Sequence, residues 1–331
     1  MTKKGLEMSK KRVIIDCDNT MGLPDWEVDD GLVLLYLLGR DDIDILGITN
    51  TFGNGSLRDV VHYTEQILKE IDRTDIPRFN GEAFSGQNPQ LILEIRAGDR
   101  YENELKLEKF PSDAAKFLVE QVTKYPGEIS ILTLGPAGNL YDAWKLDNDF
   151  YKKTKEIVLM GGYTEDLYIG EVNCRELNLS CNPEAAFSML NAECPVVVFN
   201  GHICLQAPFV LKDMKRVAFW PEDRKKIIRD WLNKVSNYYT GDAFYLWDLL
   251  PAIYISYPEL FDLKEVFISP TVKSLQSGML QPVSADDEST SNTNGVVSII
   301  MPDNILDQEK FMDILESGWR KEWERESHGW K

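Results

Sequence analysis

The sequence is short of cationic side chains, and this shortage excludes one class of partner. Its 36 lysines and arginines are outnumbered by 54 aspartates and glutamates, so the formal net charge is −18 at pH 7. A chain with this charge repels the phosphate backbone of nucleic acids and the anionic surface of a membrane. We therefore expect a small-molecule partner, with neither nucleic acid nor a membrane surface bound.

Cysteine is also scarce. The five cysteines are odd in number and include no CxxC pair, so neither a disulfide framework nor a zinc ribbon is indicated. Cysteines used in this way are typical of proteins from a reducing compartment.

Long apolar runs are absent as well. The first residues, MTKKGLEMSKK, have no apolar centre for a signal peptide, and the longest strongly apolar run is far below the roughly 20 residues that span a bilayer. No proline-rich or low-complexity linker divides the chain. We expect a soluble, cytoplasmic protein with one domain over residues 1–331 and a disordered N-terminus over 1–11.

What the sequence does contain is a repeated alternation of strand-like and helix-like segments. The strand-like segments are residues 14–15, 43–54, 129–140, 156–163 and 195–201, with a late one at 295–300. The segments between them are long enough for crossover helices, which predicts an α/β domain with an open, mostly parallel central sheet flanked by helices. Residues 81–110 have little regular pattern and are expected to form a long loop over the site.

Acidic residues gather where the first strand passes into the first helix. The stretch 13–39 reads VIIDCDNTMGLPDWEVDDGLVLLYLLG and contains Asp16, Asp18, Asp29 and Asp30. Ligands of open α/β sheets bind at this edge, and carboxylates collected there repel one another unless a cation joins them. Because all the candidate ligands are oxygens, a hard ion such as calcium or magnesium is favoured over zinc.

Helix stabilisation is the alternative explanation of Asp29 and Asp30. A negative charge near a helix N-terminus is stabilised by about 0.3 to 1 kcal/mol without any metal. Asp16 and Asp18, however, share one face of an extended chain, where burial without a partner is costly. The presence of both pairs favours a functional site.

Further candidate residues lie at the ends of later segments. Asn54, Leu134 and Met160 each mark the end of a predicted strand. Asp248 precedes an apolar helical run, where it is either an N-terminal helix charge or a carboxylate that completes a distant metal site.

A polar loop near the middle of the chain separates two kinds of residue. Asn182, followed by Pro183 and Glu184, is typical of a helix start. Glu176 and Asn178, just before it, have no such structural explanation and are therefore candidates for the site.

In their order along the chain, these motifs resemble the inosine-uridine preferring nucleoside hydrolases, a family of N-ribohydrolases. The motifs are DxDN and DD near the start, NG at 54–55, LGP at 134–136, MGG at 160–162, ExN at 176–178 and WD at 247–248. The resemblance implies a Rossmann-like fold and hydrolysis of the N-glycosidic bond of ribonucleosides to free base and ribose. It also implies a homodimer or homotetramer.

The resemblance further implies the roles of individual residues. A calcium ion would be held by Asp18, Asp30, the backbone carbonyl of Leu134 and Asp248, and Asp18 would act as the general base on a calcium-bound water. The residues implied to contact the substrate are Asp29, Asn54, Met160, Glu176, Asn178 and Trp247. A site that pairs with sugar hydroxyls predicts a strong preference for ribonucleosides over 2'-deoxynucleosides.

The sequence departs from the family pattern at two places. Residues 19–28, NTMGLPDWEV, form an insertion between Asp18 and Asp29. Trp247 stands where the family often has a histidine that protonates the leaving base, and no other histidine of the chain matches that role. Because tryptophan stacks on a base and donates no proton to it, and because the purine-preferring branch of the family also has tryptophan there, purine nucleosides are favoured.

Two alternatives remain at this point. VIIDCDNT also fits the DxDxT motif of haloacid dehalogenase-like phosphatases, in which Asp16 would be the nucleophile, Asp18 the acid/base and magnesium the cofactor. That interpretation leaves ExN and WD unexplained. The other alternative is a catalytically impaired nucleoside-binding protein, although the presence of Asp18, Asp30 and Asp248 argues against lost chemistry.

Overall fold

The computed structural model describes residues 10–82, 112–239, 241–283 and 295–328. Residues 83–110 of the predicted loop lie outside the described residues, as do residues 1–9 of the predicted disordered N-terminus. The prediction of disorder is wrong for Lys11, because this residue begins the first strand and pairs with Ile43.

Within the described residues, eight strands form the central sheet in the order β11-β12-β8-β5-β4-β1-β2-β3. Their bounds are β1 Lys11–Cys17, β2 Ile43–Asn50, β3 Arg78–Asn80, β4 Ile129–Thr133, β5 Glu156–Met160, β8 Val196–Phe199, β11 Phe261–Ile268 and β12 Val297–Ile305. All neighbouring pairs are parallel except the antiparallel hairpin of β11 and β12. The predicted fold class, a single domain with a mostly parallel sheet, is confirmed.

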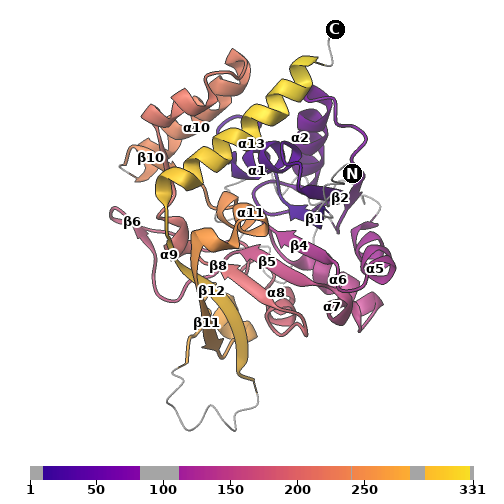
Figure 1. Cartoon of the computed structure of the whole chain (residues 1–331). Coiled ribbons are helices and arrows are strands. Elements are labelled where there is room, and N and C mark those ends of the chain that lie inside the picture. Colours follow the sequence, from indigo (N-terminus) through magenta and orange to yellow (C-terminus); the bar gives the residue numbers. More distant parts are fainter. Residues whose placement is uncertain (1–9, 83–111, 240, 284–294, 329–331) are drawn as a thin grey trace, which may run out of the picture.

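The helices and the remaining short elements surround this sheet (Figure 1). The longer helices are α1 Asp29–Leu38, α2 Leu57–Glu70, α5 Ala114–Lys124, α6 Gly138–Leu146, α8 Pro183–Leu190, α10 Glu222–Tyr239, α11 Leu249–Ser256 and α13 Gln308–His328. The shorter elements are α7 Phe150–Lys153, α9 Gly201–Cys204, α12 Val272–Leu275, η1 Leu211–Val217 and η2 Pro258–Leu260, with the small pairs β6 Tyr168–Ile169 and β7 Val172–Asn173, and β9 Pro208–Val210 and β10 Ala243–Tyr245. None of the described helices is long and apolar enough to cross a membrane.

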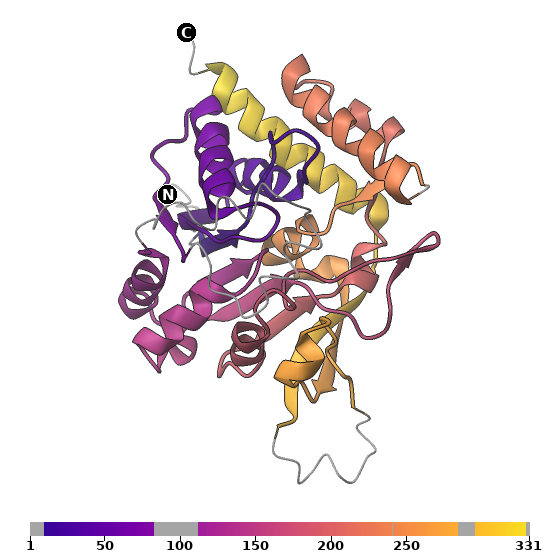
Figure 2. The same cartoon turned by 180° about the vertical axis from the view of Figure 1, so that it is seen from behind.

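Side chains of the central strands alternate between two apolar layers, one on each side of the sheet. In β1, Val13 and Ile15 pack with α1, α11 and α13, whereas Ile14 packs with α5, α6 and α8. Figure 1 shows the first set of helices in front of the sheet, and Figure 2 shows the opposite side, with α5 and α6 in magenta. Burial on both faces explains why the strands are almost continuously apolar.

Helix α1 is buried along its whole length, between the sheet and α13. Gly39 at its end lies so close to Gly318 of α13 that a Cβ on Gly39 would stand 1.8 Å from the Gly318 carbonyl oxygen. The indole Nε1 of Trp319 donates to the carbonyl of Leu32 at 3.0 Å. These contacts hold α1 against α13 near both of its ends, and Asp29 and Asp30 lie in its first turn.

The strand order makes β1 the point where the chain changes direction across the sheet. β1 lies between β4 and β2, so β2 and β3 continue on one side of it and β4, β5 and β8 on the other. In open α/β sheets, ligands bind outside the carboxyl ends of the strands at such a point. The fold therefore directs attention to the residues that follow β1.

Replacing Gly39 by alanine is expected to destabilise the fold, because the added methyl group forces α1 and α13 apart. Overpacking of this kind costs roughly 1 to 3 kcal/mol, which a lower urea midpoint would reveal. Gly241→Ala is the matched control, since no described atom lies within 4 Å of its Cβ position. An unchanged midpoint for Gly39→Ala would contradict the tight approach of the two helices.

Candidate active site

Three strands end and two helices begin at the same edge of the sheet. Asp18 follows β1, Asn54 follows β2, and Leu134 follows β4. Helices α1 and α11 begin there too, with Asp30 in the first turn of α1 and Asp248 directly before α11. The tertiary structure thus brings together residues that are far apart in the sequence.

Four carboxylates form a buried cluster at this edge. Asp29, Asp30 and Asp248 each offer an oxygen within 4.8 Å of the others. Asp18 lies beside them. Its backbone N–H donates to Asp30 Oδ1 at 3.3 Å, and its carboxylate repels those of Asp29, Asp30 and Asp248. All four side chains are buried. The structure therefore unites the predicted ligands Asp18, Asp30 and Asp248, and it adds Asp29, which the resemblance had implied as a substrate contact.

The electrostatics of the cluster fit a hard cation. Burial is the largest cause that raises the pKa of Asp29, Asp30 and Asp248 well above the ordinary value of 3.8, and repulsion from neighbouring carboxylates raises it further. Among the described residues, Asp29 Oδ1 has no hydrogen-bond partner. A buried, oxygen-only donor set of this kind suits calcium or magnesium.

Helix capping does not account for these aspartates. The residue before α1 is Val28, which makes no side-chain cap, and Asp248 makes no side-chain cap hydrogen bond at α11. The predicted cap at Asn182 is confirmed by contrast, because its Oδ1 accepts from the N–H of Ala185 at 3.1 Å. The positive ends of the α1 and α11 dipoles still stabilise the charges gathered between them.

Asn54 connects the carboxylates. Its backbone N–H donates to Asp18 Oδ2 at 2.5 Å, and its side-chain Nδ2 lies 3.1 Å from Asp30 Oδ2 and 3.4 Å from Asp18 Oδ1. Two glycines, Gly53 and Gly135 of the LGP motif, fit closely around Asp18. A Cβ on Gly53 would stand 2.0 Å from Asp18 Oδ2, and one on Gly135 would stand 2.9 Å from Asp18 Cγ. Their position in the turns that follow β2 and β4 was the available signal.

The hydrogen bonds of Asp16 are separate from this network. Its Oδ1 accepts from Thr49 Oγ1 at 2.6 Å and from Asn139 Nδ2 at 2.7 Å. Burial raises the pKa of Asp16 to about 7 in spite of these two hydrogen bonds. Its Oδ2 has no hydrogen-bond partner among the described residues. Thr49 and Asn139 are further residues that sequence analysis missed.

Asn178 joins the ends of two strands. Its Nδ2 donates to the carbonyl of Leu134 at 2.7 Å and to the carbonyl of Met160 at 3.1 Å, and it lies 3.5 Å from Met160 Sδ. A carbonyl oxygen has two lone pairs, so the Leu134 oxygen keeps one for another partner.

Glu176 is bonded to the backbone around it. Its Oε1 accepts from the N–H groups of Leu179 at 2.9 Å and Gly162 at 3.2 Å, and its Oε2 accepts from Ser180 at 2.8 Å. Burial raises the pKa of Glu176, although the backbone donors lower it in part. Gly278, with φ +75°, lies against the side chain of Glu176. In this structure Glu176 organises the loop that also carries Asn178.

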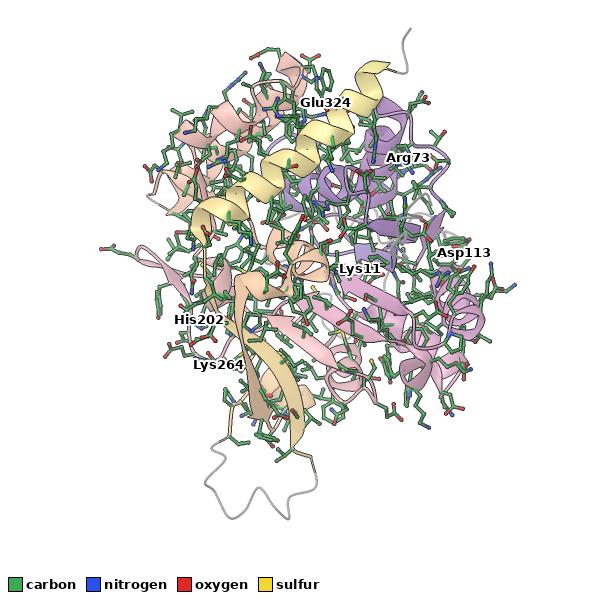
Figure 3. All side chains as sticks on the ribbon, viewed as in Figure 1. Lys11, Arg73, Asp113, His202, Lys264 and Glu324 are labelled. Atoms are coloured by element: carbon green, nitrogen blue, oxygen red, sulfur yellow. The ribbon has the colours of Figure 1, made fainter. Side chains whose placement is uncertain are left out.

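Trp247 lies beside the carboxylates, next to an apolar cluster. Its ring centroid is 5.5 Å from that of Tyr245, and both pack on the cluster of Tyr163, Leu167, Ile169 and Cys174. His202 is bonded elsewhere, with Nε2 3.2 Å from the carbonyl oxygen of Glu165, and it lies at the edge of the molecule in Figure 3. His202 therefore does not take the place of Trp247.

The insertion 19–28 packs against α2 and α10. Asn19 Nδ2 lies 3.4 Å from Thr64 Oγ1, and Lys234 Nζ donates to the carbonyl of Asp25 at 2.5 Å. Lys234 also lies 5.0 Å from the centre of the Trp26 ring. The insertion adds a further carboxylate to the site, because Glu27 contributes to the raised pKa of Asp29, Asp30 and Asp248.

Comparison with known proteins gives a consistent result. The sequence model of the family described as inosine-uridine preferring nucleoside hydrolase matches residues 13–313. The chain is 30% identical to uridine nucleosidase 1 of Arabidopsis thaliana, over 77% of this chain and 76% of that protein. It is 27% identical to probable uridine nucleosidase 2 of Oryza sativa subsp. japonica, over 82% of this chain and 81% of that protein.

Solved structures share the fold. A plant nucleoside hydrolase superposes with a TM-score of 0.77 at 22% identity, covering 93% of this chain and 98% of that one. A purine-preferring ribonucleoside hydrolase from Gardnerella vaginalis gives a TM-score of 0.74 at 19% identity, covering 95% and 99% of the two chains. With the family match spanning residues 13–313, the chain belongs to the inosine-uridine preferring nucleoside hydrolase family, enzymes that hydrolyse the N-glycosyl bond of nucleosides.

Proposed function

We propose that this protein hydrolyses ribonucleosides to free base and ribose at the buried carboxylate cluster, with calcium as its metal. The observation that carries the proposal is the convergence of Asp18, Asp30 and Asp248 from three separate segments. The family assignment supports the reaction, and the oxygen-only donor set supports the choice of a hard ion.

The ligands in this proposal are Asp18, Asp30, Asp248 and the carbonyl oxygen of Leu134. When bound, calcium would lower the pKa of the attacking water and hold hydroxyls of the sugar. The N-terminal dipoles of α1 and α11 stabilise the carboxylates that face the ion. Asn178 holds the Leu134 carbonyl in place through the hydrogen bond described above.

Asp18 is the proposed general base. An ionised carboxylate only accepts hydrogen bonds, so Asp18 can take the proton of the water that attacks the anomeric carbon. The N–H of Asn54 and the close approach of Gly53 and Gly135 keep its carboxylate in one orientation. The surrounding negative charge favours the oxocarbenium-like transition state of glycoside cleavage, because positive charge develops on the sugar.

The proposed substrate contacts are Asp29, Asn54, Met160, Glu176, Asn178 and Trp247. Asp29 Oδ1 lacks a partner among the described residues and is therefore able to accept from a sugar hydroxyl. Asn54 and Asn178 lie between the carboxylates and the strand ends, within reach of the same sugar. Glu176 also fixes the loop of Asn178, since both of its oxygens accept backbone hydrogen bonds.

Trp247 supports a preference for purine nucleosides, since a larger base gains more from stacking on the indole. The names of the plant relatives, uridine nucleosidases, support uridine as the competing substrate. The comparison of inosine with uridine therefore decides the proposed base preference.

Asp18→Asn is expected to lower kcat by about 10²- to 10⁴-fold, because it removes the proton acceptor and keeps the size of the side chain. Release of ribose from inosine and uridine, with calcium present, is the measurement. Asp44→Asn, at an exposed carboxylate of β2, serves as the control and should retain wild-type turnover. Near-normal turnover of Asp18→Asn would remove Asp18 as the base.

Calcium is expected to stabilise the protein at neutral pH, by about 2.7 kcal/mol at one hundred times its Kd. When a chelator has removed the metal, Asp29, Asp30 and Asp248 have higher pKa values in the folded state than in the unfolded chain. The folded state therefore binds more protons than the unfolded chain. The free energy of unfolding of the chelated protein should therefore rise as the pH falls from 8 to 6. Urea unfolding with calcium and with chelator, at both pH values, tests this. Identical curves in calcium and chelator would contradict a metal at this site.

Trp247→Leu is expected to lower kcat/KM for inosine by roughly tenfold and for uridine by less, because the loss of stacking affects the larger base more. Steady-state kinetics of both nucleosides on both proteins measure the effect. Trp144→Leu, at a tryptophan outside the cluster, is the control. A wild-type enzyme that prefers uridine, or an equal loss for both substrates, would rule out base selection by Trp247.

A further inference from the structure

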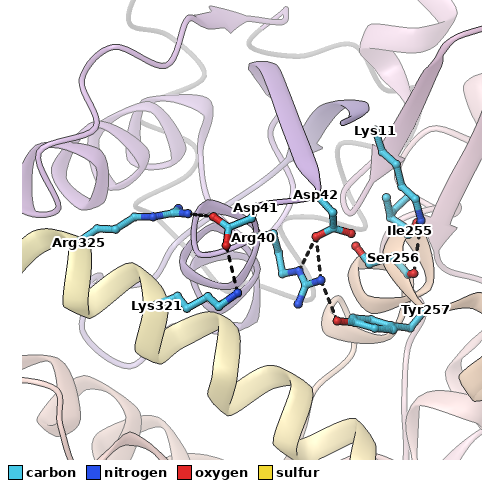
Figure 4. Close-up of polar contacts among 9 residues, drawn as sticks. All are labelled: Lys11, Arg40, Asp41, Asp42, Ile255, Ser256, Tyr257, Lys321 and Arg325. Carbon is cyan, nitrogen blue, oxygen red and sulfur yellow. Dashed lines mark hydrogen bonds and ion pairs between the residues drawn. The ribbon is translucent and has the colours of Figure 1, made fainter. Parts of the chain in front are cut away.

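The two helices that carry carboxylates of the cluster are joined to each other at their opposite ends. α1 begins at Asp29 and α11 follows Asp248, and the two helices pack against one another. Beyond their C-terminal ends lies a group of polar side chains that we name the distal clamp, formed by Lys11, Arg40, Asp42 and Tyr257 (Figure 4).

Arg40 connects the end of α1 to the end of α11. Its Nε donates to Asp42 Oδ1 at 2.8 Å, and its Nη2 donates to the hydroxyl of Tyr257 at 2.8 Å. The guanidinium carbon lies 4.8 Å from the centre of the Tyr257 ring. Because the Arg40 side chain is only 10% exposed, these contacts are shielded from water in part. Tyr257 directly follows α11 as its C-cap residue.

Lys11 connects the same helix end to the start of β1. Its Nζ donates to the carbonyl of Ile255 at 2.6 Å and to that of Ser256 at 3.3 Å. These are the last carbonyls of α11, where the helix dipole is negative and a lysine is stabilising. Figure 3 shows Lys11 beside α11. Its strand, β1, leads to Asp18 at the other end.

The distal clamp therefore holds the far ends of three segments that lead to proposed calcium ligands. β1 leads to Asp18, α1 carries Asp30 in its first turn, and α11 directly follows Asp248. At about 1.5 Å per residue, helices of this length place the clamp about 12 to 15 Å from the carboxylates. Calcium binds oxygens at about 2.3 to 2.6 Å, so a small slide of α11 against α1 and β1 would misplace Asp248.

We propose that Lys11, Arg40 and Tyr257 are positioning residues that set the spacing of the calcium ligands from the opposite end of their segments. The inference rests on the proposed function, because it takes calcium as the bound ion. It assigns to this polar group a role in metal affinity, beyond its contribution to stability.

A neighbouring polar group provides a matched control. Asp41, one residue from Arg40, accepts from Lys321 at 3.2 Å and pairs with Arg325, both on α13 (Figure 4). Since α13 carries none of the proposed ligands, Asp41→Asn removes charged contacts next to the distal clamp, at a more exposed position, without releasing α11.

The test measures calcium binding to the purified full-length chain by isothermal titration calorimetry after removal of metal by a chelator. Tyr257→Phe removes one hydroxyl and keeps the ring, and Lys11→Met removes the charge and keeps the length. We expect the Kd for calcium to rise about tenfold in each variant, an effect seen when residues that orient metal ligands are changed. Asp41→Asn should keep the wild-type Kd, and Lys11→Arg should restore most of the affinity.

Kinetics give a second measurement that a purely structural role would leave unchanged. The calcium concentration for half-maximal activity should rise in Tyr257→Phe and Lys11→Met, while kcat at saturating calcium returns to about the wild-type value. Wild-type Kd values in both variants, accompanied by a lower melting temperature, would overturn the inference and leave the proposed function intact. A wild-type protein that binds no calcium would overturn both, whereas one that binds calcium and cleaves no nucleoside would reject the proposed reaction alone.

Discussion

The structure depends on keeping mutually repelling carboxylates together in its interior. Asp18, Asp29, Asp30 and Asp248 are all buried at one point, and the pKa values of the last three rise through burial and repulsion. An unpaired buried charge costs several kcal/mol, so the surrounding fold has to supply stability that the cluster removes. The two apolar layers on either side of the sheet supply it.

The fold lowers this cost by gathering the carboxylates where helix dipoles and hydrogen-bond donors face them. The site is formed at the ends of three strands and at the starts of two helices, so α1 and α11 direct their positive dipole ends at the carboxylates. Asn54 then donates to two of them, and glycines beside Asp18 allow the backbone to approach. Binding of a divalent ion would neutralise the remaining charge. The same arrangement thus serves stability and the proposed chemistry.

Much of the fold and part of the site could be predicted from the sequence. The alternation of apolar strands and helices gave the mostly parallel sheet, and the order of short acidic motifs identified Asp18, Asp30 and Asp248 as residues that meet. Other features escaped prediction because they are made by backbone groups of distant segments. Glu176, a proposed substrate contact, also accepts the N–H groups of Gly162, Leu179 and Ser180, which the sequence did not indicate. Lys11, expected in a disordered terminus, is bonded to the end of α11.

The sequence by itself determined the elements, the family and the kinds of ligand atoms, because hydrophobic periodicity and side-chain chemistry are local properties of the chain. Only the tertiary structure decided which carboxylates share one space and how they are held. In the structure, Asp29 belongs to the carboxylate cluster, and Asp16 is hydrogen-bonded to Thr49 and Asn139. Glu27 of the insertion lies near the site. The physical reason is that electrostatic and hydrogen-bond energies depend on distances between residues far apart in sequence, and packing of the helices on the sheet fixes those distances.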